Sequence, residues 1–165
     1  ARVPLFFFQA VQAALLPRLS GLVGQEKFSE LWKELKRLLT LVIGLGAAAV
    51  LFMTLFGPHI VVLAFGEEFR VTSGDMALLS CSSAGLMIAL SLTQALIACK
   101  VQGRMASAWV IGVGVFPAAL QIAPNDLFLR VEIALIVTVF TTSLLMFALL
   151  MRTLQKVPSN QIQRN

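Results

Sequence analysis

Few side chains in this sequence combine a reactive type with a spacing suited to chemistry. The single histidine, His59, follows Pro58, and an imidazole that titrates near neutral pH could relay protons there. A lone histidine near a helix end also serves simply as an interfacial polar group. Glu67 and Glu68 form a carboxylate pair that could hold a cation or could lie in a solvated turn next to Gly66.

Neither cysteine points to catalysis or to a metal. Cys81 and Cys99 lie within or at the end of an apolar run, where a thiol behaves as a small apolar group, and no CxxC spacing is present. The sequence also lacks a glycine-rich phosphate loop, an HExxH motif and a nucleophile elbow. We therefore predict a protein that is not an enzyme and that holds no metal and no cofactor.

The composition is that of a membrane protein. Of the 165 residues 58% are hydrophobic and 13% are charged, whereas globular proteins have about 45–50% and about 25%. The mean hydropathy is +0.88. The net charge of +5 comes from cations dispersed between apolar runs, so no continuous basic patch for a nucleic acid is expected.

The elements that must position these side chains are long apolar helices. Backbone polar groups in lipid must be satisfied internally, and the runs are too long and too uniformly apolar for barrel strands. We predict an all-α polytopic transmembrane bundle with four complete spans, the end of a fifth and an interfacial amphipathic helix. The four spans are Leu38–Ala64, Met76–Ala98, Met105–Ala123 and Ile133–Met151.

The chain divides into four predicted segments. Residues 1–16 are the end of an upstream transmembrane helix, since the chain opens on an apolar run without a methionine, and residues 17–37 are a cytoplasmic linker. Residues 38–151 form the four-helix bundle, and residues 152–165 are a cytoplasmic tail. A proline lacks the N–H that a helix needs, so we expect kinks near Phe56, before Pro58, and at Pro117.

The linker carries an amphipathic helix. Apolar residues recur at intervals of three and four from Glu26 to Leu39, while Lys33, Lys36 and neighbouring charges occupy the other face. Such a helix lies in the headgroup layer, with Trp32 at the boundary, and then turns into the bilayer. The alternative is an ordinary solvated helix packed on a soluble domain. Pro17 and two following glycines separate this helix from the upstream one.

The charges predict one orientation. Lys and Arg near helix ends are retained on the cytoplasmic side. One threading puts most cations there, namely Arg18, Lys27, Lys33, Lys36, Arg37, Lys100, Arg104, Arg152, Lys156 and Arg164. The opposite side receives Arg2, Arg70, Arg130, Glu67, Glu68, Asp75, Asp126 and Glu132. None of the four spans has a central charged residue, so a strong ion or phosphate site is expected elsewhere in the protein.

Three fragments together resemble a transporter family. They are LLPRLS at 15–20 after Arg2-Val3-Pro4, LAFGEEF at 63–69 after Gly57-Pro58, and a serine-rich helix ending in a basic loop at Lys100–Arg104. Their order is similar to that in the carboxy-terminal lobe of the multidrug/oligosaccharidyl-lipid/polysaccharide exporter superfamily, particularly its oligosaccharide and lipid II flippases. The resemblance implies an amino-terminal lobe outside this sequence, with a cavity between two lobes.

The resemblance also implies roles for particular residues. Arg2 would reach the diphosphate of a lipid-linked substrate, or else would extend to the outer headgroups. Gln9 and Gln12, three residues apart on the same helix, would line the cavity or would bond a neighbouring helix. Pro17, Pro58 and Gly66 would act as hinge or motif positions.

A further polar stripe is predicted without the resemblance. Ser83, Ser91 and Gln94 fall near one stripe of the second span, which favours close helix packing through small residues over cavity lining.

The function implied by the resemblance is transport across the cytoplasmic membrane. The substrate would be a polyprenyl-diphosphate-linked sugar, flipped from the inner to the outer leaflet for polysaccharide or cell-wall synthesis. Two alternatives remain open: a drug or cation antiporter of the same superfamily, and a small membrane scaffold protein that does not transport. The expected partners are the bilayer, the lipid-linked sugar and the amino-terminal lobe.

Overall fold

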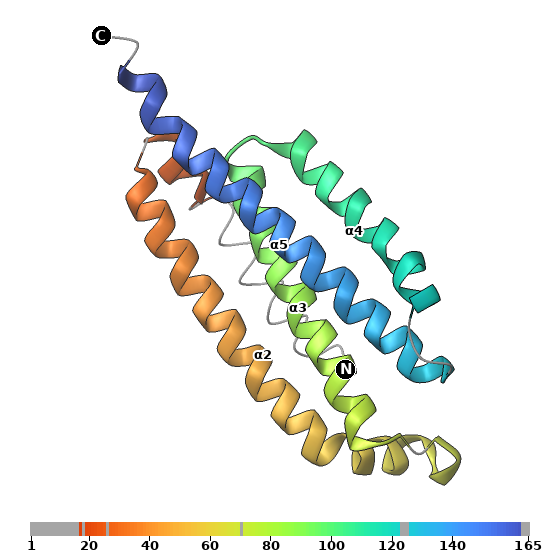
Figure 1. The fold of residues 1–165 in the computed structure, drawn as a ribbon. Helices are drawn as coiled ribbons and strands as arrows, with labels where there is room; N and C mark the ends of the chain where they lie inside the picture. The colour runs from red at the N-terminus through yellow and green to blue at the C-terminus, as the bar shows by residue number, and fades with distance from the viewer. Residues whose placement is uncertain (1–16, 18, 26, 70, 123–125, 163–165) are drawn as a thin grey trace.

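The protein folds as a bundle of long helices that run alternately up and down. The structure is a computed structural model and describes residues 17, 19–25, 27–69, 71–122 and 126–162. Helix α2 (Phe28–Phe65) is followed by a short 3-10 helix, η1 (Glu67–Phe69), and then by α3 (Ser73–Ala98), α4 (Gln102–Ile122) and α5 (Leu127–Ile162). Figure 1 shows these helices side by side. The described residues contain no strand, so the all-α prediction is confirmed.

Four of the helices are long and apolar enough to cross a membrane. The apolar stretches are Ser29–Phe65, Ser73–Ala98, Gln102–Ile122 and Leu127–Leu154. Their outward faces carry many large apolar side chains, such as Leu51, Leu63 and Leu144, which are 64%, 90% and 69% exposed. Apolar surface on this scale is suited to lipid or to further helices and unsuited to water.

Helix α2 joins the amphipathic segment and the first span without a break. Leu31, Leu35, Leu38 and Val42 are all buried and lie on one stripe that faces the other helices. No glycine or proline occurs between Phe28 and Thr40 to end a helix. The amphipathic segment therefore forms the first turns of α2 and continues as one helix into the first span.

The far end of α2 bends and then stops. Pro58 lies inside the helix, and in Figure 1 the last, yellow-olive turns of α2 run in a different direction from the rest. Gly66 ends the helix with a φ of 95°, and its N–H donates to the Val62 carbonyl at 2.8 Å. A positive φ of this size favours glycine because it has no Cβ.

Helices α3 and α5 begin at polar capping residues, and each begins before the first residue of the predicted apolar span. Thr72 and Asp75 form a capping box at the start of α3, with bonds of 2.9 and 3.2 Å. At the start of α5 the Asp126 carboxylate accepts from the Phe128 N–H at 3.1 Å. Helix α5 thus begins six residues before the predicted Ile133 and includes Glu132.

Residues with small side chains bring the helices together. A Cβ added at Gly46 of α2 would lie 2.8 Å from the Ala84 Cβ of α3, and one added at Gly85 of α3 would lie 2.8 Å from the Val139 Cγ1 of α5. Gly112 of α4 lies in the same way against the Thr142 side chain of α5. Such contacts let helix backbones approach closely, which drives association where lipid removes the hydrophobic effect.

The main apolar core lies at the end of the bundle where α2 begins. It joins the segment before α2 to α2, α3, α4 and α5 through buried side chains: Leu19, Leu31, Leu35, Leu92, Ala95, Leu96, Ala98, Ala108, Met146 and Leu150. Trp32 borders this core, with its ring centroid 6.2 Å from that of Phe147 and the Lys36 ammonium 5.2 Å from its centroid.

The contact between Gly112 and Thr142 gives a test of the packing. We expect Gly112→Ala to lower the free energy of unfolding by about 1–3 kcal/mol, because the new methyl group would overlap the Thr142 side chain. The matched control is Gly114→Ala on the same helix, where a Cβ meets nothing within 4 Å. Thermal unfolding in detergent should show a lower Tm for the first variant alone, and Thr142→Ala should restore part of the loss. Equal behaviour of the two alanine variants would contradict the close approach of α4 and α5.

Candidate functional site

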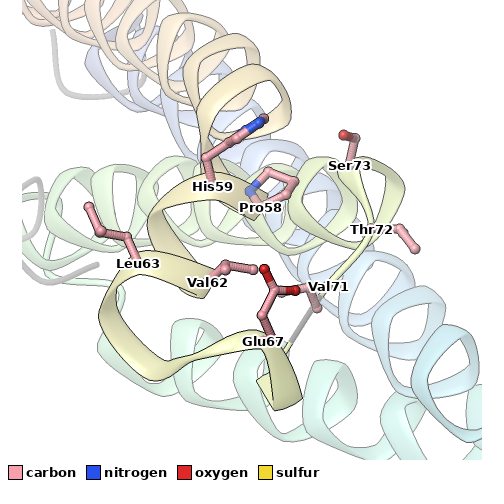
Figure 2. A pocket seen from close by; sticks show the side chains of 8 residues that line it. All are labelled: Pro58, His59, Val62, Leu63, Glu67, Val71, Thr72 and Ser73. Atoms are coloured by element: carbon pink, nitrogen blue, oxygen red, sulfur yellow. The ribbon is translucent and has the colours of Figure 1, made fainter.

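A cavity of about 670 Å³ lies at the bent end of α2. It opens between the last turns of α2, η1 and the first turn of α3 (Figure 2). Four polar residues line it: His59, Glu67, Thr72 and Ser73. Its apolar lining consists of Pro58, Val62, Leu63 and Val71.

Local sequence explains why a hollow forms here. Pro58 has no N–H to donate within the helix and its ring pushes on the preceding turn, so α2 bends at this point. Gly66 then turns the chain, and η1 leads to the capping box at Thr72. Helix η1 and the capped start of α3 form the side of the cavity opposite the last turns of α2.

The described lining combines one acidic side chain with neutral polar and apolar groups. Glu67 supplies an acidic side chain, and Figure 2 shows its carboxylate near Val62 and Val71, while the His59 ring lies beyond Pro58. Among the described residues that line the cavity there is no lysine or arginine. In the described part of the chain no group of three or more His, Cys, Asp or Glu is placed to hold a metal ion.

The two cysteines are free thiols outside this cavity. Burial raises the pKa of the Cys99 thiol, at the end of α3, so the thiol stays protonated at neutral pH. A protonated thiol is a weak nucleophile.

The structure does not gather the predicted polar stripe of α3 into one site. Ser91 is fully buried and its hydroxyl donates to the Met87 carbonyl at 2.7 Å. Ser83 is exposed and donates to the Leu79 carbonyl at 2.9 Å, and Gln94 is half-buried. Each of the two serines bonds a carbonyl of its own helix.

The remaining predicted site residues divide into two groups. Arg2, Gln9 and Gln12 lie outside the described residues. Pro17 is helical, and Pro58 and Gly66 lie at the bend and at the end of α2, where Pro58 also lines the cavity.

Glu132 is the residue that sequence reasoning misplaced. It was predicted to lie with the loop charges outside the spans, but it lies in α5 and is 2% exposed. Both of its carboxylate oxygens are buried without a hydrogen-bond partner. The prediction is wrong because it placed the start of this helix by hydropathy alone, whereas the cap at Asp126 sets the start of α5. An Asp followed by LFLRVE was the signal that could have revealed the longer helix.

Cations gather at the opposite end of the bundle from the cavity. The start of α2, the turn between α3 and α4, and the last turns of α5 lie toward the same end in Figure 1. These segments, with the first turn of α4, carry Lys27, Lys33, Lys36, Arg37, Lys100, Arg104 and Arg152. A tight turn joins α3 to α4, with Lys100 at a φ of 58°. The positive-inside rule relates such a charge bias to orientation.

Together these features define a class of protein. An all-α bundle with four apolar helices of membrane-crossing length is a multi-pass membrane protein. Comparison with known protein families, with curated proteins and with solved structures gave no match.

The charge bias predicts which ends face the same side. In a background with Cys81→Ser and Cys99→Ser, cysteines introduced at the exposed positions Ser29 and Glu68 should react from opposite sides of the membrane. A membrane-impermeant maleimide added outside intact cells should label position 68 and spare position 29, because the basic end stays inside. Labelling of position 29 alone would reverse the orientation, and labelling of both would contradict the span.

Proposed function

We propose that this chain is part of a transporter that flips a polyprenyl-diphosphate-linked oligosaccharide from the inner to the outer leaflet of the cytoplasmic membrane. One observation carries the proposal. The described residues of the three fragments that resemble the exporter superfamily lie at alternating ends of one bundle. Leu19 is in the core at the basic end, LAFGEEF is at the cavity end, and Lys100–Arg104 returns to the basic end. This alternation agrees with the order that the resemblance implies.

The exposed surface supports a role as one wall of a larger assembly. Helix α2 packs on α3 along one stripe, while side chains such as Leu41, Leu51 and Leu55 are 56%, 64% and 57% exposed. Lipid can cover such side chains, and so can the helices of a second lobe. A substrate with a sugar, a diphosphate and a lipid tail requires a polar cavity flanked by walls of this kind.

The resemblance gives Arg2 as the proposed contact for the diphosphate and Gln9 and Gln12 as proposed cavity-lining residues. A guanidinium offers a planar pair of donors that match phosphate oxygens. The cations of the described basic end lie on α2, the α3–α4 turn, the start of α4 and α5, and we assign to them the orientation of the bundle.

A cation-driven drug antiporter of the same superfamily is the second candidate. The observation that favours it is the buried carboxylate of Glu132 inside an apolar helix, because ionisable residues within spans commonly mark ion pathways. The two candidates differ in substrate, so one assay separates them.

The test is reconstitution of the full-length protein in liposomes. A fluorescent polyprenyl-diphosphate sugar placed in one leaflet should reach the other leaflet faster than in protein-free liposomes, as read by an impermeant quencher. Export of a cationic dye without movement of the lipid-linked sugar would favour the antiporter. Movement of neither substrate would contradict transport.

Arg2 supplies the variant that tests the proposed contact. Arg2→Ala should slow translocation of the diphosphate lipid about tenfold or more, because hydrogen bonds to charged groups contribute about 1.5–3 kcal/mol. Arg2→Lys should recover part of the rate, since it keeps the charge but loses the paired donors. Arg152→Ala, at the exposed basic end, is the matched control and should keep the parent rate. An unchanged rate in Arg2→Ala would remove Arg2 from the site.

A further inference from the structure

We propose that Glu132 is a proton-binding site that controls how closely the start of α5 packs on the start of α3. The inference concerns the bundle itself and holds for either candidate substrate.

The register of the two helices places Glu132 between them. Gly85 of α3 lies against Val139 of α5, and the Ser143 hydroxyl donates to the Gly85 carbonyl at 3.3 Å. Further along, the Thr93 hydroxyl lies 3.4 Å from the Met146 sulfur. The two helices are therefore parallel. Seven residues make about two turns, so Glu132 lies on the same face of α5 as Val139, two turns earlier.

The same count places an apolar residue of α3 opposite the carboxylate. Leu78 precedes Gly85 by two turns, on the face of α3 that meets α5. Leu78 is half-buried, and Glu132 is 2% exposed with both oxygens unpartnered. The carboxylate is thus enclosed next to apolar surface.

The charged groups around Glu132 do not favour its ionised form. Asp75, at the start of α3, and Asp126, just before α5, both act on it with like charge. Arg130 of α5 lies two residues earlier, about 200° round the helix. Helix α4 has Arg104 as its charged residue, at its opposite end, and α2 reaches α5 through Trp32 and Phe147, also at the basic end. His59 of α2 is exposed.

Binding of a proton by Glu132 removes the charge that is unfavourable in this buried position. An ionised carboxylate enclosed without a partner is costly, and such a group takes up a proton and becomes neutral. The proton binds one carboxylate oxygen and returns to water when it leaves, so no other reactant is needed. The protonated form suits the closed packing of α3 and α5, whereas the ionised form requires water to enter between them. The site therefore links proton binding to two arrangements of these helices.

Thermal unfolding of the complete protein in detergent tests this link. In the folded state the enclosed carboxylate of Glu132 has no hydrogen-bond partner, so its neutral form fits the closed packing, and stability is present at low pH and is lost as pH rises. The apparent Tm should fall by at least about 3 °C between about pH 5 and about pH 8. Glu132→Gln, a neutral mimic of the protonated acid, should abolish most of this dependence. Glu68→Gln, at an exposed carboxylate of the same end, is the matched control and should keep it.

A second readout follows the opening itself, and its first measurement is made with Glu132 in place. With Cys81→Ser and Cys99→Ser, a cysteine at Leu78 should react with a small maleimide faster as pH rises, after correction for the intrinsic pH dependence of thiol reactivity. Glu132→Gln, or Glu132→Leu if that variant fails to fold, should keep the corrected rate low at every pH.

Three results would overturn the proposal. They are a Tm of the parent protein that does not change with pH, an equal pH dependence in Glu132→Gln, and a corrected labelling rate at position 78 that is flat with pH. A Tm that responds to sodium concentration at fixed pH, and only when Glu132 is present, would assign the site to a metal cation instead of a proton. Because none of these measurements uses a transport substrate, failure here and failure of the proposed transport function are distinguishable.

Discussion

Helix α3 comes close to α2 on one side and to α5 on the other because the contacts are made by residues with little or no side chain. Gly46 lies against Ala84, and Gly85 lies against Val139. In lipid there is little hydrophobic drive to bring two apolar helices together, so dispersion between closely approaching backbones must do so. The positions of α2 and α5, and through α5 that of α4, depend on these contacts.

This arrangement gives the two ends of the bundle different characters. At the basic end α2, α3, α4 and α5 share one apolar core with the segment before α2, and this core includes Leu19, Leu92 and Leu150. At the other end α2 bends at Pro58, the chain turns at Gly66, and a cavity opens beside the capping box of α3. A tightly packed end and a looser end suit a protein in which one end moves against the other. The buried carboxylate of Glu132 lies toward the looser end.

At Glu132 the chemistry of the side chain opposes its position, because a carboxylate prefers water or a partner and the helix packing encloses it without either. An enclosed carboxylate without a partner opposes the packing around it, and the like charges of Asp75 and Asp126 add to the conflict. Conflicts of this kind in an otherwise consistent sequence are expected at functional positions. The polar side chains of α3 show no such conflict, since Ser82, Ser83 and Ser91 each bond a carbonyl of their own helix.

The sequence by itself determined the class of the molecule. Long apolar runs require helices because the backbone in lipid must satisfy its own hydrogen bonds, and the spacing of lysines and arginines predicted which helix ends share a side. The helix limits were less predictable, because caps such as Asp126 and the unbroken segment from Phe28 to Thr40 extend the helices past the apolar runs. Only the tertiary structure decided that Glu132 is buried while Ser83 is exposed. Burial of one face of a helix depends on which neighbour packs there, and that contact joins residues more than fifty positions apart, as Ser143 and Gly85 show.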